Sequence, residues 1–123
     1  MSNSQSAFDP VGIVVDWLDA CRERRLADVL DLYDDQAELG CCDGGRYDGR
    51  SGLLRYWRPK LQNASAGAFV LDEIEPEEKR VRLDYRDHDG RAVRTTFWFN
   101  DVGKIVRTIC VPVGANGAST KAA

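Results

Sequence analysis

The feature that most constrains the fold is an alternation of apolar and charged residues in the second half of the chain. Residues 79–87 alternate in this way, and residues 92–99 keep the two-residue period, with Val93, Thr95, Phe97 and Phe99 on one face and Arg94, Thr96 and Trp98 on the other. Asp89-Gly90, between the two runs, is a common two-residue hairpin turn. Because successive side chains of a strand point to opposite faces, the pattern predicts an antiparallel hairpin with one buried face.

Further strands are expected on both sides of this hairpin. Residues 68–71 read as a strand that leads to a turn around Pro76, and residues 100–103 turn the chain into a last strand over 104–111. We therefore expect an antiparallel meander. Its inner face would carry Val81, Leu83, Tyr85, Val93, Thr95, Phe97 and Phe99.

The first half of the chain is expected to be mainly helical. Asp9-Pro10 is a strong helix start, and apolar residues recur at helical spacing to about residue 24. A second short helix should carry Tyr33 on its apolar face and close at Asp34-Asp35. A strand over 37–41, a loop over 43–49 and a third helix capped by Ser51 should follow, with Pro59 kinking or ending that helix. Helices followed by a meander predict an α+β fold with the helices on one sheet face.

Length and composition fit one folded domain. The chain has 123 residues, of which 43% are hydrophobic and 30% charged, and we expect a domain over 9–112 with flexible tails at 1–8 and 113–123. The net charge of −3 disfavours nucleic-acid or anionic-membrane partners. No apolar run reaches the roughly 20 residues of a membrane span. Residues 1–6 lack the features of a secretion signal, so we expect a cytoplasmic protein.

The cysteines offer no recognisable metal site. Cys21, Cys41, Cys42 and Cys110 form no Cys-x-x-Cys pair, and His88 is the single histidine. We expect no metal and no cofactor. In a reducing cytoplasm the four cysteines should be free thiols that pack as small apolar groups, with Cys41 buried and unreactive.

Three segments carry a family resemblance. They are residues 32–39, the loop 45–50 that leads to Tyr56-Trp57, and residues 97–105. In this order, the chain resembles the nuclear transport factor 2-like superfamily, which includes SnoaL-like proteins and ketosteroid isomerase. Over residues 10–112 the resemblance implies a cone-shaped fold, with three helices on a strongly curved antiparallel sheet that encloses a pocket. It implies no single activity, because the fold hosts isomerases, cyclases, epoxide hydrolases and binding modules.

The resemblance does not extend to the isomerase machinery. That enzyme uses an aspartate base, with a tyrosine and a protonated aspartic acid as oxyanion donors. The corresponding positions of this chain hold Cys41 for the base, Trp17 for the tyrosine and Thr95 for the second aspartate. Since all three differ in type, the sequence does not predict ketosteroid isomerase chemistry.

No other residues form a complete catalytic set. Cys41 would need a base, and we expect His88 to be exposed at the hairpin tip. Asp43 and Asp48 are expected to form turns and caps at the pocket rim, and Asp84 to lie on the outer sheet surface. We therefore predict no catalytic residue.

The predicted pocket lining is aromatic or neutral. Such a lining is typical of a small-molecule pocket and equally of a filled core. One interpretation is a SnoaL-like protein that binds a small apolar or aromatic molecule in a neutral cup, with weak isomerase- or cyclase-type activity as an extension. The alternative is a non-catalytic dimerisation or interaction module with a mostly filled cup. The predicted lining residues are Trp17, Cys41, Tyr56, Trp57, Tyr85, Thr95 and Phe97.

A homodimer is expected through the outer face of the sheet. Alternation places Thr96 and Trp98 on the face away from the helices, and Ile109 and Val111 beside them. Large apolar residues on that face need a second cover. The resemblance points the same way, since many members of the superfamily pair through this surface.

Overall fold

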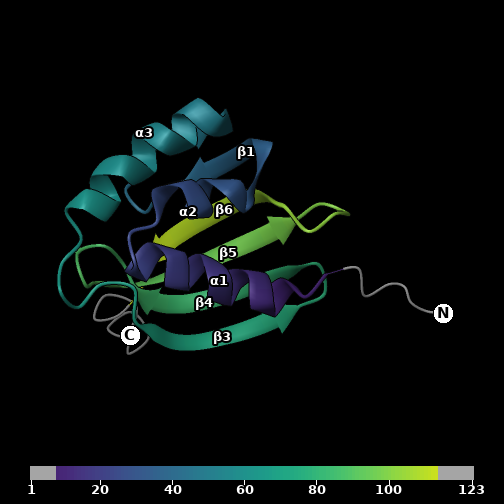
Figure 1. The fold of residues 1–123 in the computed structure, drawn as a ribbon. Helices are drawn as coiled ribbons and strands as arrows, with labels where there is room; N and C mark the ends of the chain where they lie inside the picture. Colours follow the sequence, from purple (N-terminus) through teal and green to yellow (C-terminus); the bar gives the residue numbers. More distant parts are fainter. Residues whose placement is uncertain (1–7, 114–123) are drawn as a thin grey trace.

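The computed structural model describes residues 8–113, which form three helices and six strands (Figure 1). The predicted tails fall mostly on residues outside this range. Phe8, at the end of the predicted first tail, packs its ring 5.8 Å from that of Phe99. Every helix in the described range is too short or too polar to cross a membrane.

Helix α1 (Pro10–Arg22) begins as predicted, with Asp9 at the N-cap and Pro10 in the first turn. Its buried face includes Val14, Trp17 and Cys21. The short helix α2 (Leu26–Asp31) follows. Both helices therefore bury the apolar stripe that their spacing predicts.

Helix α3 (Gly49–Gln62) corrects two predictions. Its N-cap is Asp48, so Ser51 lies inside the helix and does not cap it. Pro59 also lies inside the helix, which continues to Gln62. Leu53, Trp57 and Leu61 form the buried stripe and hold the helix against the sheet across the proline.

Strand β1 (Tyr33–Gly40) begins earlier than predicted. Tyr33 is buried, but it opens the strand and does not belong to the second helix. Asp34 and Asp35 belong to the strand and do not form a turn. The ladder that joins this strand to the last strand of the sheet shifts its register between Tyr33 and Glu38, so the two polar residues lie at an irregularity of the pairing. Asn100 donates to Asp34 at 3.2 Å and anchors this segment.

The predicted loop over 43–49 contains a short strand, β2 (Arg46–Asp48). It pairs antiparallel with β1, with Tyr47 opposite Leu39. The alternation is too short to stand out in a glycine-rich sequence, so the expectation of a loop was wrong for these three residues.

The meander consists of β3 (Leu71–Glu77), β4 (Arg80–Arg86), β5 (Ala92–Phe99) and β6 (Ile105–Pro112). The β4–β5 hairpin forms as predicted, but its turn is longer than the two residues Asp89-Gly90, since Arg86 pairs with Ala92 and the Asp87 amide donates to the Arg91 carbonyl. Strand β3 differs: it starts after Phe69, whose φ of 58° interrupts the extended backbone. Pro76 pairs with Val81, so the turn expected around residues 76–78 begins at Glu78 and covers 78–79.

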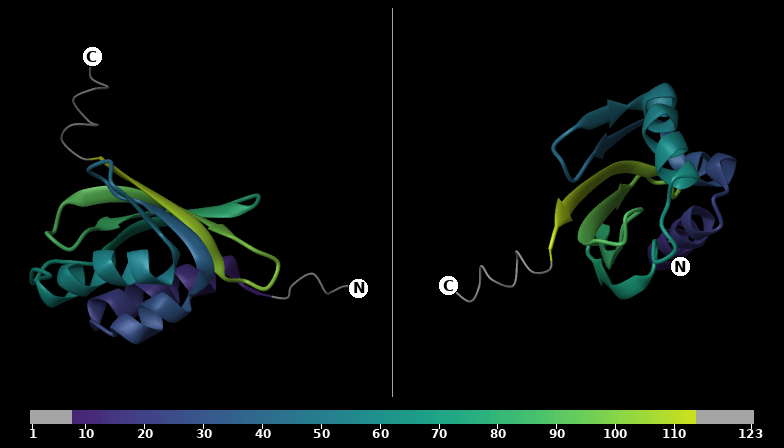
Figure 2. Two further views of the ribbon diagram at one scale, coloured as in Figure 1. Left: turned by 90° about the horizontal axis from the view of Figure 1, so that it is seen from above. Right: turned by 90° about the vertical axis from the view of Figure 1, so that its left-hand side faces the viewer.

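The sheet order is β2-β1-β6-β5-β4-β3, and β1 pairs with β6 in parallel. The sheet is therefore mixed and not wholly antiparallel as expected. Figure 2 shows all three helices beneath one face of the curved sheet, while no helix of residues 8–113 covers the other face. The core lies between the helices and the inner face. The α+β class and the helices on a curved sheet agree with the prediction.

Candidate functional site

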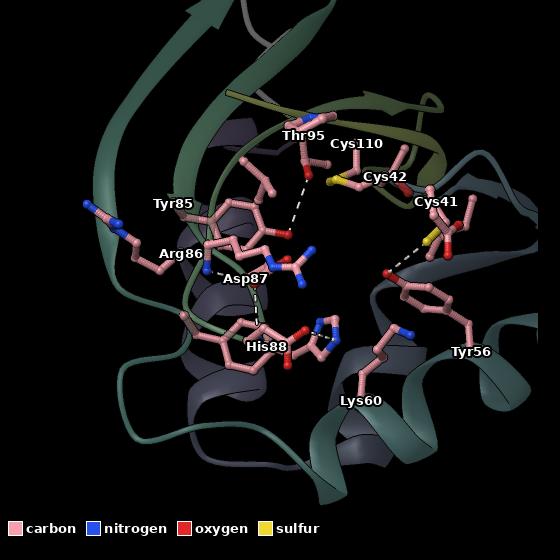
Figure 3. Close-up of a pocket in the computed structure, with 18 of the residues that line it drawn as sticks. Cys41, Cys42, Tyr56, Lys60, Tyr85, Arg86, Asp87, His88, Thr95 and Cys110 are labelled. Carbon is pink, nitrogen blue, oxygen red and sulfur yellow. Dashed lines mark hydrogen bonds and ion pairs between the residues drawn. A yellow bond between two sulfur atoms is a disulfide. The ribbon is translucent and has the colours of Figure 1, made fainter. Parts of the chain in front are cut away.

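A cavity of about 830 Å³ opens between the inner sheet face and the helices. Helices α1 and α3, the end of β1 and strands β4 to β6 all contribute to its wall. Its size lies within the range of small-molecule sites in proteins. Figure 3 shows the labelled side chains converging on it from the sheet and from α3.

Six of the seven predicted lining residues lie in this wall. They are Trp17, Cys41, Tyr56, Trp57, Tyr85 and Thr95. Phe97 does not line the cavity, because its fully buried ring lies 4.9 Å from that of Trp17, behind the wall. Whether the six residues bind a ligand stays a prediction.

Trp17 packs against two other aromatic residues of the cavity wall. Its ring meets those of Trp57 and Tyr85 edge-on, with centroids 5.6 and 5.5 Å apart. Its indole N–H donates to the Tyr33 hydroxyl at 3.1 Å. Sequence reasoning missed Tyr33 as a lining residue, because the residue was assigned to the second helix. The interlocked rings give the cavity a rigid aromatic floor.

Neutral polar groups lie among the aromatic rings of this floor. The Thr95 hydroxyl donates to the Tyr85 hydroxyl at 3.4 Å, and Thr108 lies nearby in the wall. The indole N–H of Trp57 is buried and has no hydrogen-bond partner within residues 8–113. Tyr33 is a polar neighbour of this group, since the Trp57 side chain contributes to lowering the pKa of the Tyr33 phenol against the effect of burial.

Cys41 is half-buried and lies in the cavity wall, so the expectation of a buried thiol was wrong. Strand β1 ends at Gly40, and Cys41 is the first residue of the turn that follows. Its sulfur lies 3.8 Å from the Tyr56 hydroxyl (Figure 3). The strand alternation that predicted burial therefore stops one residue before Cys41.

Two of the cysteines form a disulfide, which corrects the expectation of four free thiols. Cys42 and Cys110 are bonded across 68 residues, with Cα atoms 4.7 Å apart. The parallel pairing of β1 with β6 brings the ends of the two strands together, a contact that local cysteine spacing cannot reveal. The disulfide forms part of the cavity wall (Figure 3), and Cys21 and Cys41 remain free.

Charged residues gather at the mouth of the cavity. They come from the turn after β1, from α3, and from the end of β4 with the turn that follows it, and sequence reasoning placed only Asp43 at the rim of the site. His88 was expected to be exposed at the hairpin tip, but its side chain is only 23% exposed and lines the cavity. The turn is tied to the 63–70 segment, since the Ser65 amide donates to the His88 carbonyl at 2.8 Å. The charged mouth residues are Asp43, Lys60, Arg86, Asp87, Asp89 and Arg91.

Asp43 shapes the turn at the mouth, as its predicted role implied. Its carboxylate accepts the Gly45 amide at 3.1 Å. A hydrogen bond from the Cys41 side chain, together with this amide, holds the pKa of Asp43 below its ordinary value. Asp48 is exposed and makes no capping hydrogen bond.

The buried tyrosines of the cavity keep their protons near neutral pH. Burial raises the pKa of the Tyr33, Tyr56 and Tyr85 phenols well above the ordinary value. Such phenols can donate a hydrogen bond to a carbonyl oxygen but cannot serve as bases. Residues 8–113 hold no group of three or more His, Cys, Asp or Glu side chains suited to a metal ion.

No protein-family model and no curated protein sequence matches the chain. Solved structures do match. A SnoaL-like protein of unknown function from Burkholderia thailandensis is 22% identical with a TM-score of 0.78, over 92% of this chain and all of the other. A candidate polyketide cyclase from Sinorhizobium meliloti is 19% identical with a TM-score of 0.70, over 84% of this chain and 99% of the other.

An NTF2-like protein of unknown function from Cytophaga hutchinsonii is 10% identical, with a TM-score of 0.70 over 96% of this chain and 99% of the other. At these identities the likeness concerns the fold and not the chemistry. This chain therefore has the fold of the SnoaL-like and NTF2-like proteins, as the sequence resemblance implied.

Proposed function

We propose that this protein binds a small, apolar or aromatic molecule in its cavity. The observation that carries the proposal is the cavity itself, about 830 Å³ with a wall of aromatic rings and neutral hydrogen-bonding groups. Apolar walls supply affinity by removing apolar surface from water, while a few polar groups fix the orientation. The open volume favours this proposal over the alternative of a mostly filled cup.

The polar groups of the wall favour a ligand that carries a carbonyl or hydroxyl oxygen. Tyr56, Tyr85 and Thr95 contribute hydroxyl groups to the cavity wall. The phenols stay protonated, so they suit an acceptor oxygen.

The experiment is a thermal-unfolding screen with neutral aromatic compounds of two to four rings that carry a ketone or hydroxyl. A ligand present at 100 times its Kd stabilises the folded state by about 2.7 kcal/mol, a rise of several degrees in Tm. A panel that produces no rise at millimolar concentration contradicts the proposal.

Two variants locate the binding. Cys41→Trp places a large ring in the cavity wall and should abolish the ligand-induced rise in Tm. Val102→Trp adds the same ring on the β5–β6 turn, where Val102 is 76% exposed, and should leave the rise intact. If the ligand raises the Tm of both variants as much as that of the wild type, the ligand binds outside the cavity.

We also propose that the protein forms a homodimer through the outer sheet face. Thr96 and Ile109 are cross-strand neighbours on this face, flanked by Trp98 and Val111. Val111 is 45% exposed. Trp98 lies between two guanidinium groups, 5.9 Å from Arg80 and 5.0 Å from Arg107. This mixed apolar and cationic surface is typical of an interface centre.

The variant that tests the dimer is Ile109→Glu. A carboxylate at Trp98 would find Arg80 and Arg107 beside it, so Trp98→Glu is a poor disruptor. The cross-strand neighbours of Ile109 are Thr96 and Gly40, neither of which is charged. Ile109→Glu should therefore dissociate the dimer at the cost of a buried, unpaired charge. Light scattering of the wild type at 13.7 kDa, the mass of one chain, would refute the dimer.

A further inference from the structure

The charged groups at the cavity mouth differ in how many hydrogen bonds and ion pairs they already make within the protein. Asp43 accepts the Gly45 amide at 3.1 Å. Asp87 accepts the amides of Asp89 and Arg91 at 2.9 and 3.0 Å. These carboxylates hold the turns that build the mouth, and much of their accepting capacity is occupied.

The cationic side chains that line the same mouth make fewer such contacts with the rest of the protein. Arg86 pairs with Asp72 at 3.5 Å, away from the cavity. Within residues 8–113, neither Lys60 nor Arg91 forms an ion pair with a carboxylate. Lys60 is near enough to Asp43 to contribute to the lowered pKa of that carboxylate, but neither cation is held in an ion pair, so both keep donors for an acceptor on a ligand.

Lys60 is placed to meet a ligand. It stands on α3, and its half-buried side chain lies along the Tyr56 ring, with the ammonium nitrogen 4.9 Å from the ring centroid. Figure 3 shows the ammonium group pointing into the cavity, between Tyr56 and His88. Held over an aromatic ring of the wall, the ammonium group lies beside the space that a ligand would fill.

Arg91 lies across the opening, on the β4–β5 turn. Its backbone is fixed by paired hydrogen bonds with Asp87, since the Asp87 amide donates to the Arg91 carbonyl at 2.9 Å. Arg91 is exposed and lines the cavity. The two cations thus approach one opening from separate, well-ordered elements, above a floor that carries no ionised side chain.

We propose that the ligand is an aromatic or apolar carboxylate, with its ring system in the cup and its carboxylate bound by Lys60, assisted by Arg91. This inference rests on the proposed function and specifies the class of ligand. A single carboxylate fits better than a phosphate dianion, because Asp43, Asp87 and Asp89 already bring negative charge to the mouth. Charge-assisted hydrogen bonds of this kind are about twice as strong as neutral ones.

The test compares acids with their primary amides, which match them in shape and lack the charge. The probes are 2-naphthoate with 2-naphthamide and 9-anthracenecarboxylate with its amide, titrated calorimetrically at pH 7.5 and low salt. We expect each acid to bind at least about tenfold more tightly than its amide, the size of effect expected for a hydrogen bond to a charged group. The preference should shrink as salt is added, because ions screen the partly exposed contact.

Substitutions assign the preference to residues. Lys60→Gln should reduce the acid-to-amide ratio to about threefold or less and leave amide affinity nearly unchanged, and adding Arg91→Gln should remove the rest. Lys79→Gln removes an exposed lysine of the β3–β4 turn, away from the cavity, and should change neither value. Unfolding temperatures of all variants without ligand check that the fold is retained.

The outcomes separate this inference from the function on which it rests. Amides that bind the wild type as tightly as the acids refute the carboxylate proposal while leaving small-molecule binding intact. A preference for acids that survives in the doubly substituted protein refutes the role of Lys60 and Arg91. Failure of both acids, both amides and the whole neutral panel to bind refutes the inference together with the proposed function.

Discussion

Removing the Cys42–Cys110 disulfide should destabilise the fold strongly while leaving the core residues in place. The bond joins the turn after β1 to β6 and closes a loop of 68 residues that includes β2, α3 and the β3–β5 meander. Strands β1 and β6 are held side by side by a parallel ladder with a shifted register. The disulfide therefore stabilises the pairing of β1 with β6, whose residues lie far apart in the sequence.

The loop length sets the expected magnitude. Cross-linking the unfolded chain across 68 residues reduces its conformational entropy by an amount worth about 4 kcal/mol at 25 °C. Whole domains of this size are stable by only about 5–15 kcal/mol. The loss should therefore be a large fraction of the total stability and easy to measure.

The assay is urea unfolding, followed by tryptophan fluorescence, of the oxidised protein, the reduced protein and the variant with Cys42→Ser and Cys110→Ser. With an m-value of about 1.5 kcal/mol/M, the unfolding midpoint should fall by about 2–3 M when the bond is removed. Cys41→Ser is the matched control, because it removes a neighbouring thiol outside the bond. Reducing agent should not shift the midpoint of the double variant.

Two results would refute this reasoning. The denatured, unreduced protein should show two reactive thiols, from Cys21 and Cys41, and four thiols would mean that the bond does not form. A bond that forms but whose reduction moves the midpoint by less than about 0.5 M would show that chain entropy is not the source of its effect.

Two further predictions follow from burial. Cys41, half-buried in the cavity wall, should react with a small thiol reagent well before Cys21, whose pKa is raised by complete burial, and a bound ligand should protect Cys41; faster labelling of Cys21 would contradict this. The raised pKa of Tyr33, Tyr56 and Tyr85 means that the unfolded chain loses these protons first, so stability should fall as pH rises above about 10. Absorbance at 295 nm should show the three phenols ionising together with loss of the fold, and gradual ionisation in the folded protein would count against their burial.

The parts of the fold that were predictable have strong local signals. The β4–β5 hairpin follows from clean alternation around Asp89-Gly90, and α1 follows from Asp9-Pro10 and its apolar stripe. In these segments, periodicity and turn chemistry point to the same structure. Tyr33 shows the limit: its apolar character was compatible with a helix or a strand, and the decision came from pairing with Ile105 of β6.

Five of the six lining residues could be predicted because they belong to helices and strands whose inner face the helical stripe or the alternation reveals, and the sixth, Cys41, directly follows β1. Lys60, His88 and Arg91 were missed because each is polar and adjoins a turn or a helix end, where polarity is read as exposure. Their position depends on the 63–70 segment, whose Ser65 and Phe69 amides donate to the carbonyls of His88 and Arg86. No local pattern encodes that contact between segments about 20 residues apart.

The floor and the mouth of the cavity differ in chemistry because the floor is built mainly by helices and strands and the mouth mainly by turns. The floor is built by residues that the core would bury in any case, so it is aromatic and neutral, and its raised phenol pKa values are a consequence of packing. The mouth is built by turns, which tolerate charge because they lie near water. A ligand with an apolar body and one charged end would match both parts at once. The acid–amide comparison and Cys41→Trp probe the mouth and the cup separately, so each half of that match can fail independently.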